Sequence, residues 1–376
     1  MQKKRWSILF IMMLSLLLIA SACGGGSNGG SGQTGQTPSS ASTGSSSSDQ
    51  TGQNQDNGST ADAAKKINAV YYVNSTLGDK SFFDSAQAGM EKAAAELGIS
   101  FKTVEGGVNP SDWASGLEAV VAGGNYNVVV VGTSQMIDVT KELAERYPDI
   151  KFIFFDSLIE GVPNIYSMLY SQSEGSFLAG AFAAMVTTST ELEKANPEKV
   201  IGFVGGMDIP IINDFLYGYE QGAQYVDPEV KVVASYVGDF VNAPKAKELA
   251  MAQIDSQKAD IIFNVASAAG LGTLEGASEK GVYSIGVDGN QNPLYPGSVL
   301  TSMLKDVGQS IYRAFDLMIK DELPFGTGEV LGIKEGAIGL AKDELYEQYV
   351  PQSIKDKMIE IEQKVASGEI KVESAL

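Results

Sequence analysis

Four stretches of the chain carry side chains that suit the binding of a small molecule, and each lies beside an apolar run typical of a buried strand. Asn74–Phe83 joins an amide, an acid and a lysine to two phenylalanines. Phe240 lies in a Gly-Asp-Phe turn, Asp288 ends an apolar strand, and Lys305 follows Leu-Thr-Ser-Met-Leu. Aromatic faces stack on flat rings, a carboxylate accepts hydrogen bonds from a pair of hydroxyls, and an ammonium donates them. These stretches therefore predict a small-molecule site.

Weaker candidates end other apolar runs, and every candidate has a structural alternative. They are Asp79, Gly132 with the Thr-Ser-Gln that follows it, Asp156, and Asn264 with Ser267. In open α/β sheets ligands bind beyond the carboxyl ends of the strands, which is where these residues are expected. The alternatives are an acid that caps its own loop, a phenylalanine that fills the core, and a lysine that is solvated.

The residue inventory narrows the chemistry that the chain could perform. It has no histidine and one cysteine, Cys23, which excludes Ser-His-Asp triads, histidine-ligated metals and disulfides. A nucleoside hydrolase would need aspartates clustered around calcium, and no Asp-x-Asp-x-x-x-Asp-Asp run occurs. Gly270–Gly272 matches a dinucleotide loop only in part, because Glu275 replaces the third glycine and would repel a pyrophosphate. We therefore expect no metal, no cofactor and no catalysis.

The composition fits a folded, acidic protein of two lobes. Of the 376 residues 44% are hydrophobic, which is enough for ordinary cores, and the length suits two units. A formal net charge of −19 and a sequence pI of about 4.4 argue against binding to nucleic-acid polymers, because phosphates would be repelled. A small ligand without a phosphate escapes that objection.

The elements that must position these side chains alternate between strands and helices, as expected for a doubly wound, mainly parallel sheet. One set has strands at Ile67–Val73, Asn127–Gly132 and Lys151–Phe155, with helices at Asp84–Leu97, Ser111–Val121 and Met136–Tyr147. A second set has strands at Lys199–Val204, Val230–Val237, Asp260–Phe263 and Val282–Val287, with helices at Ile212–Tyr225, Ala243–Ser256 and Leu271–Lys280. Two such sets predict two similar α/β lobes that close on a ligand through a hinge.

The chain is expected to pass between the lobes more than once. Residues 63–171 are assigned to the first lobe and 172–302 to the second, which begins with a helix of small residues. Residues 303–325 should return to the first lobe, with the helix Val307–Ile319 packed on it. A further crossing is expected near 322–326, so that 326–376 belongs to the second lobe and ends in an amphipathic helix.

The N-terminal part is predicted to export and tether the protein. Residues 1–22 have a basic start, an apolar run and a small-residue end, which is the layout of a signal peptide. Cys23 follows directly and resembles the cysteine of a bacterial lipobox, with Ala20 where leucine is usual. We therefore expect a diacylated cysteine on the cell membrane. Residues 23–62, rich in Gly, Ser, Gln and Thr, should form a flexible linker.

Several of the candidate stretches together resemble one known family. Gly78-Asp-Lys-Ser-Phe-Phe-Asp-Ser-Ala86 resembles the opening motif of the basic membrane protein (BMP) family of substrate-binding lipoproteins, which includes purine nucleoside receptors of ABC importers. Tyr236–Lys247 and Val299–Lys305 are similar to later motifs of the family, and the similarity covers about residues 67–312. The resemblance implies a two-lobed, type I periplasmic-binding-protein-like fold with a nucleoside between the lobes.

The resemblance also implies roles for individual residues. Phe82 and Phe240 would stack on opposite faces of the purine ring, while Asp288 and Lys305 would hold the ribose. Asn74 stands where the family has an acid that contacts the base edge, and an amide can also read that edge.

Other positions depart from the family pattern or are given a structural role. Phe83 stands where the family usually has asparagine, and it is expected to pack beneath the loop, with a larger stacking wall as the alternative. Ser267 stands where the family tends to have glycine, and Gly205–Pro210 matches the family but is interpreted as a structural turn.

These observations predict an extracytoplasmic, membrane-anchored solute-binding lipoprotein that delivers a nucleoside, a purine nucleoside by the resemblance, to an ABC permease. Two alternatives stay open. One is a sugar ligand in the same fold, since stacking aromatics and diol-binding acids also suit pyranoses. The other is an extracellular receptor that signals through a partner, which a permease operon beside the gene would argue against.

Overall fold

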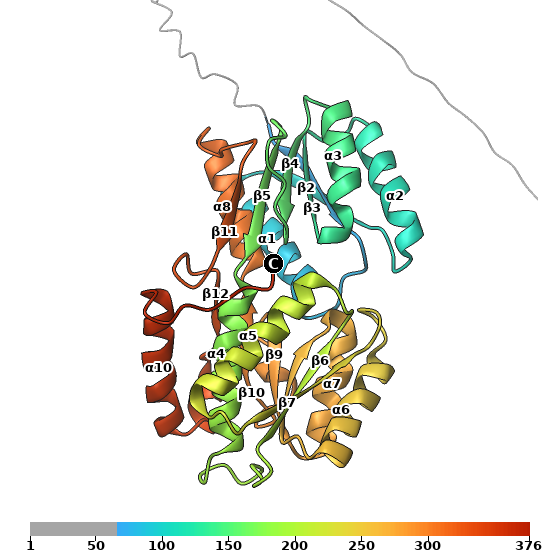
Figure 1. The fold of residues 1–376 in the computed structure, drawn as a ribbon. Helices are drawn as coiled ribbons and strands as arrows, with labels where there is room; N and C mark the ends of the chain where they lie inside the picture. Colours follow the sequence, from blue (N-terminus) through green and yellow to red (C-terminus); the bar gives the residue numbers. More distant parts are fainter. Residues whose placement is uncertain (1–65) are drawn as a thin grey trace, which may run out of the picture. The chain divides into compact units, whose positions relative to one another are not determined.

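The computed structural model describes residues 66–376, which form two α/β lobes, each built on its own six-stranded sheet (Figure 1). The predicted fold class, two doubly wound and mainly parallel sheets flanked by helices, is confirmed. The predicted signal peptide, Cys23 and the linker lie outside the described residues.

The first sheet has the strand order β11-β5-β4-β3-β1-β2, and its strands are all parallel. The strands are β1 (Asn68–Val73), β2 (Ser100–Glu105), β3 (Val128–Gly132), β4 (Lys151–Phe155), β5 (Ile165–Tyr170) and β11 (Gly328–Leu331). One face is covered by α1 (Phe82–Leu97) and α8 (Val307–Ile319), and the other by α2 (Pro110–Ala122) and α3 (Ile137–Arg146).

The second sheet has the order β12-β10-β9-β8-β6-β7 and is parallel except for β12, which is antiparallel to β10. Its strands are β6 (Val200–Gly205), β7 (Lys231–Tyr236), β8 (Ile261–Val265), β9 (Tyr283–Asp288), β10 (Val299–Lys305) and β12 (Ile338–Leu340). Its helices are α4 (Gln172–Thr187), α5 (Pro210–Val226), α6 (Ala243–Gln257), α7 (Gly270–Glu279), α9 (Glu344–Tyr349) and α10 (Gln352–Ala366). In Figure 1, α4 and α5 lie on one face and α6 and α7 on the other.

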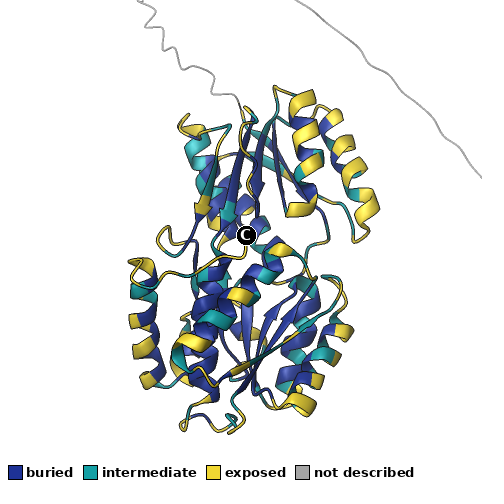
Figure 2. Ribbon diagram, in the orientation of Figure 1, coloured by how far each residue is buried: buried dark blue, intermediate teal, exposed yellow. Residues whose placement is uncertain are grey.

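Burial explains why the central strands are apolar on both faces (Figure 2). In β3, Val129 and Val131 join the core under α2 and α3, while Val128 and Val130 join the core under α1. All four side chains are fully buried. A parallel strand between two helical layers therefore has no alternation of polar and apolar residues, and the run of valines is what the fold requires.

Within residues 66–376 the chain passes between the sheets three times, after β5, after β10 and after β11. The third crossing lies between Leu331 and Ile338 and corrects the predicted position at 322–326. Gly328–Leu331 still pair with β5 of the first sheet before the chain leaves it. A four-residue edge strand carries too little pattern to be distinguished from a connecting loop.

The helices α4 and α5 approach each other so closely that glycine is required at their contact. A Cβ atom on Gly222 would lie 1.9 Å from the carbonyl oxygen of Phe177, and one on Gly180 would lie 2.0 Å from that of Tyr219. We predict that Gly222→Ala lowers the free energy of unfolding by about 2–3 kcal/mol, because two helix backbones must separate. Urea denaturation measures this.

The matched control is Gly276→Ala in α7, whose Cβ would come no closer than 3.3 Å to any neighbour. Alanine favours a helix over glycine by about 1 kcal/mol, so this variant should be close to wild type. If both variants lost the same amount of unfolding free energy, the close-packing explanation would be contradicted.

Candidate functional site

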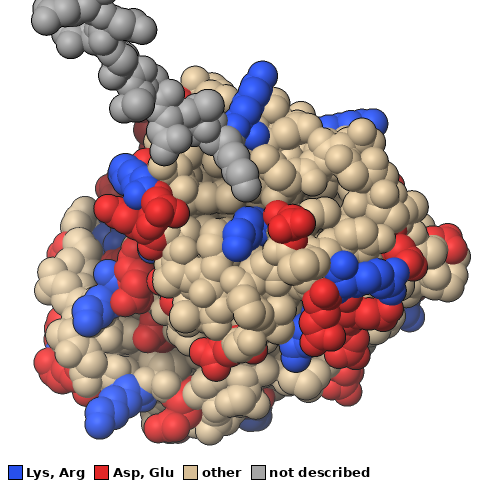
Figure 3. All heavy atoms as spheres, turned by 90° about the horizontal axis from the view of Figure 1, so that it is seen from above, with Lys and Arg blue, Asp and Glu red and all other residues tan. Residues whose placement is uncertain are grey.

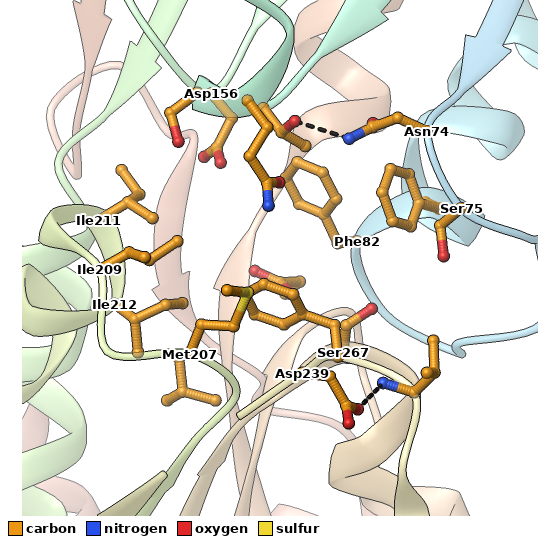
Figure 4. A pocket seen from close by; sticks show the side chains of 18 of the residues that line it. Asn74, Ser75, Phe82, Asp156, Met207, Ile209, Ile211, Ile212, Asp239 and Ser267 are labelled. Carbon is orange, nitrogen blue, oxygen red and sulfur yellow. Dashed lines mark hydrogen bonds between the residues drawn. The ribbon is translucent and has the colours of Figure 1, made fainter. Parts of the chain in front are cut away.

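A pocket lies where the carboxyl ends of the strands of the two sheets face each other, and both lobes line it (Figure 4). Its volume is about 170 Å³. Figure 4 shows one side formed by Asn74, Ser75 and Asp156 and the other by Met207, Asp239 and Ser267.

Aromatic side chains line the pocket from both lobes. Phe82 begins α1 in the first lobe, and Phe240 lies in the loop after β7 in the second. The Phe82 ring packs edge-on against Phe83, with 5.0 Å between the centroids, and lies 5.4 Å from the ring of Phe155. Phe83 also lines the pocket while it packs in the core, so both of its expected roles meet in one side chain.

Asp156, Asp288 and Lys305 form a charged group at one end of the pocket. The Lys305 Nζ lies 2.8 Å from Asp156 Oδ1 and 3.8 Å from Asp288 Oδ1, and all three residues are buried. Burial lowers the pKa of the Lys305 ammonium, but Asp156 and Asp288 outweigh that effect and raise it. Burial raises the pKa of the Asp288 carboxyl to about 6, although Lys305 acts in the opposite direction.

Three aromatic rings surround the Lys305 ammonium. Its Nζ lies 4.9 Å from the ring centroid of Phe82, 5.0 Å from that of Phe215 and 5.7 Å from that of Tyr170. Cation–π attraction therefore adds to the ion pair in holding the ammonium beside the stacking face of Phe82. An aromatic face and a hydrogen-bond donor are thus presented to the same region of the pocket.

Two buried polar atoms in the pocket lining have no hydrogen-bond partner among residues 66–376. One is Oδ1 of Asp288, whose Oδ2 accepts a 2.8 Å hydrogen bond from the Ser81 hydroxyl. The other belongs to Asn74, whose Nδ2 donates to Thr133 Oγ1 at 2.9 Å while Oδ1 stays unpaired. An unpaired buried acceptor costs free energy, so both atoms suit a ligand that donates hydrogen bonds.

The loops that carry the site hold strained backbone. Non-glycine residues with left-handed φ follow or end four of the strands at the pocket: Thr133 (74°), Asp156 (70°), Ser267 (48°) and Asp288 (61°). Such conformations cost roughly 1–3 kcal/mol each and cluster at binding sites. In this chain they turn the backbone sharply at the carboxyl end of a strand.

Three of the weaker candidates, Asp79, Gly132 and Asn264, do not line the pocket. Asn264 is fully buried, and its Nδ2 donates to Gln291 Oε1 at 3.2 Å. Asp79 is buried and caps α1, since its carboxylate accepts hydrogen bonds from the backbone N–H groups of Phe83 (3.0 Å) and Asp84 (3.1 Å). A Cβ atom on Gly132 would lie 2.5 Å from the ring of Phe155, so this glycine makes room for that ring. The remaining site candidates, Asn74, Phe82, Asp156, Phe240, Ser267, Asp288 and Lys305, all line the pocket.

Hydrogen bonds join the lobes around the pocket. Ser267 Oγ of the second lobe donates to Asp79 Oδ2 of the first at 2.9 Å. Ser81 Oγ donates across the same boundary to Asp288 Oδ2, and Lys305 binds Asp156. The lobes are therefore closed in this structure, with the lining residues of both in place around the cavity.

The second lobe contributes an apolar wall to the pocket that was not predicted from the sequence. Met207, Ile209, Ile211, Ile212 and Phe215 line the pocket, and Figure 4 shows the three isoleucines together along one side. The turn Gly205–Pro210, interpreted from the sequence as structural, therefore carries pocket residues as well. Its position directly after a strand was the available signal, because this is where site residues are expected.

Three further observations concern metal-binding groups, surface charge and membrane-spanning helices. No group of three or more His, Cys, Asp or Glu side chains with metal-binding geometry occurs among residues 66–376. On the face shown in Figure 3, acidic and basic side chains lie side by side without a basic stripe. In the same part of the chain, no helix is both long enough and apolar enough to cross a membrane.

Comparison with known proteins places the chain in a family. The family model of PnrA-like ABC transporter substrate-binding proteins, Bmp, matches residues 66–374. Basic membrane protein A2 of Borrelia garinii subsp. bavariensis is 32% identical over 320 residues, which cover 83% of this chain and 89% of the relative. A solute-binding protein of an ABC transporter system from Aeropyrum pernix K1 superposes with a TM-score of 0.74 at 27% identity, covering 81% of this chain and 92% of that one. The chain therefore belongs to the Bmp family of ABC transporter substrate-binding proteins, as its motifs predict.

Proposed function

We propose that the protein binds a purine nucleoside between its lobes and delivers it to the permease of an ABC importer, without catalysing a reaction. The observation that carries the proposal is the pocket itself, which is lined by aromatic rings from both lobes and by Asp288, whose buried Oδ1 has no hydrogen-bond partner among residues 66–376. Phe82 and Phe240 stack on the two faces of the base, and Asn74 reads its edge. Asp288 and Lys305 hold the ribose hydroxyls.

Asp156 supports the same end of the site. Its carboxylate fixes the Lys305 ammonium at 2.8 Å, so the ammonium is directed toward the ribose and does not turn into solvent. Removing Asp156 would leave a buried positive charge with a more distant partner. We therefore assign it to the ribose-binding group, while Asp79 and Ser267 hold the lobes together behind the ligand.

The apolar part of the lining favours a nucleoside over a free sugar. A sugar presents hydroxyls on all sides, and those that faced Ile209, Ile211 and Met207 would lose water without gaining a partner. A purine base has apolar faces, and stacking contributes roughly 1–3 kcal/mol per base. A pocket with one polar end and one apolar wall thus fits a ribose joined to a flat ring.

Delivery to a permease also requires a position at the membrane. We propose that Cys23 is acylated after removal of residues 1–22 and that residues 23–62 act as the spacer between the lipid and the lobes. This arrangement would keep the binding lobes on the extracytoplasmic face and close to the transporter.

Mass spectrometry of the protein purified from membranes without added ligand tests both the proposed ligand and the proposed lipid anchor. The proposal expects acyl chains on Cys23 and a nucleoside that dissociates on unfolding. Thermal-shift assays on the stripped protein should then show stabilisation by purine nucleosides and none by ribose or hexoses. Stabilisation by free sugars alone would overturn the nucleoside assignment.

Nucleoside affinity should fall about tenfold between pH 7 and pH 5. The pKa of Asp288 is raised to about 6, so the carboxyl is ionised at pH 7 and mostly protonated at pH 5. Binding selects the ionised form, which accepts two hydroxyl hydrogens, so acid must weaken binding and the affinity should level off above pH 7. Calorimetric titration at several pH values measures this, and tighter binding in acid would contradict the assigned role of Asp288.

A further inference from the structure

The strand orders of the two sheets determine which loops line each part of the pocket. Starting from the side where the chain crosses between the lobes, the strands of the first sheet have the order β5-β4-β3-β1-β2. In the same direction, toward the outer edge, those of the second sheet have the order β10-β9-β8-β6-β7. Lys305 at the end of β10 pairs with Asp156 after β4, and Ser267 after β8 binds Asp79 in the loop after β1. These contacts align the two orders, so the loops after β2 and β7 face each other at the outer edge.

The polar groups with free hydrogen-bonding capacity lie toward the crossing side and the middle. Asp156, Asp288 and Lys305 follow or end strands on the crossing side, and Asn74 follows the central strand β1. A ribose held by Asp288 and Lys305 therefore sits near the crossings, and the base extends from it toward the outer edge, between Phe82 and Phe240.

The outer edge of the pocket is apolar. Val108, Pro110 and Trp113 line it from the first lobe and Val241 lines it from the second, and we call these four residues the outer compartment. Val108 is 54% exposed and Val241 41% exposed, so part of this apolar surface is open to solvent at the mouth of the pocket.

Two polar atoms close to the outer compartment, the indole nitrogen of Trp113 and Oδ1 of Asp239, form hydrogen bonds within their own loops. The indole Nε1–H of Trp113 donates to the carbonyl oxygen of Gly107 at 2.7 Å, so the indole offers only its apolar surface to the pocket. Asp239 Oδ1 accepts hydrogen bonds from the backbone N–H groups of Val241 (2.8 Å) and Asn242 (2.7 Å). A polar ligand group would therefore find few partners here.

Closure of the lobes does not remove the outer compartment. Ser267 and Asp79 are already hydrogen-bonded at 2.9 Å, and Lys305 and Asp156 at 2.8 Å, while Val108 and Val241 remain exposed on the two sides of the pocket. When the lobes are closed, the two valines therefore do not pack against each other to close the cleft. The space between them remains available to part of a ligand.

We propose that the natural ligand carries an apolar substituent on its base and that the outer compartment binds this substituent, with Trp113 as its main contact. The inference rests on the proposed function and makes it more specific, since the substrate class becomes base-modified nucleosides with an alkyl or aryl group. An unmodified nucleoside binds the same site but leaves the outer compartment in contact with water.

Titration calorimetry with three ligands tests the proposal. They are adenosine, adenosine benzylated on its exocyclic amine, and adenosine with a benzylamino group on the imidazole carbon, so the same group is presented from both ends of the base. Burying a phenyl-sized group is worth roughly 1.5–3 kcal/mol, so at least one benzylated ligand should bind wild-type protein about tenfold tighter than adenosine. Trp113→Ala should reduce that gain below threefold while it changes adenosine binding less than threefold.

Trp113 also fixes its own loop through Gly107, so a second variant separates contact from loop order. Val241→Asn on the opposite lobe changes an exposed side chain and should reduce the gain as well. The proposal is overturned if neither benzylated ligand binds more tightly than adenosine, or if the gain persists in both variants. A complete absence of binding by all three ligands would instead overturn the nucleoside function itself, which keeps the two failures distinct.

Discussion

Asp288→Asn is expected to weaken nucleoside binding about 100-fold at pH 7.5. One oxygen of the carboxylate accepts a hydrogen bond from Ser81, and the other lies 3.8 Å from the Lys305 ammonium and has no hydrogen-bond partner among residues 66–376. Hydrogen bonds to a charged group contribute about 1.5–3 kcal/mol, and losing the charge that accepts a pair of ribose hydroxyls should cost about 3 kcal/mol. Asparagine tolerates the left-handed backbone at this position, so the loop should keep its conformation.

Asp239→Asn is the matched control for this substitution. Asp239 also lines the pocket, but its Oδ1 accepts hydrogen bonds from its own loop, so binding should change less than threefold. Circular dichroism and the melting temperature establish that both variants are folded. If Asp288→Asn bound the nucleoside as tightly as the wild type does, the proposed role of Asp288 in holding the ribose would be wrong.

Replacing both aromatic faces is expected to have the next largest effect. Phe82→Leu and Phe240→Leu should each weaken nucleoside binding about tenfold, and the double variant about 100-fold, because each ring contributes roughly 1–3 kcal/mol of stacking. Leucine keeps most of the apolar volume, so the variants test the flat ring more than hydrophobic contact. The two rings belong to different lobes but share the base as their partner, so the double variant measures how far their effects add.

Stability must be measured beside affinity for these variants. Phe82 is 7% exposed and packs against Phe83 and Phe155, so its loss costs folding free energy as well as binding. Phe325→Leu is the control, since Phe325 is partly buried against the same core and does not line the pocket. If all three single variants showed the same small change in affinity, stacking would be excluded as the source of binding energy.

The fold and much of the pocket could be predicted from the sequence because parallel sheets obey simple rules. Fully apolar runs identify central strands, and the residues directly after such strands must meet at one edge of the sheet. Asp156 and Asp288 were found in this way, Lys305 was identified by its similarity to a family motif, and all three line the pocket. The motif resemblance supplied Phe82 and Phe240, which line it from opposite lobes.

The remaining features depend on tertiary packing and leave little trace in the pattern. Ile209 and Ile211 are indistinguishable in sequence from core residues of a helix start, and only the position of α5 turns them toward the pocket. Asp79 is an acid in the loop after β1, which suggests a ligand contact. Its carboxylate instead accepts hydrogen bonds from backbone N–H groups at the start of α1. The edge strands β2 and β11 are partly exposed, so they lack the apolar run that revealed β3.

A crystal structure of the protein with adenosine tests the nucleoside site most directly. The account predicts the purine ring between the side chains of Phe82 and Phe240, with ribose hydroxyls about 2.7–2.8 Å from the carboxylate of Asp288 and the Lys305 ammonium beside them. A nucleoside bound elsewhere, or a pocket that takes up a free sugar and leaves adenosine in solution, would contradict it.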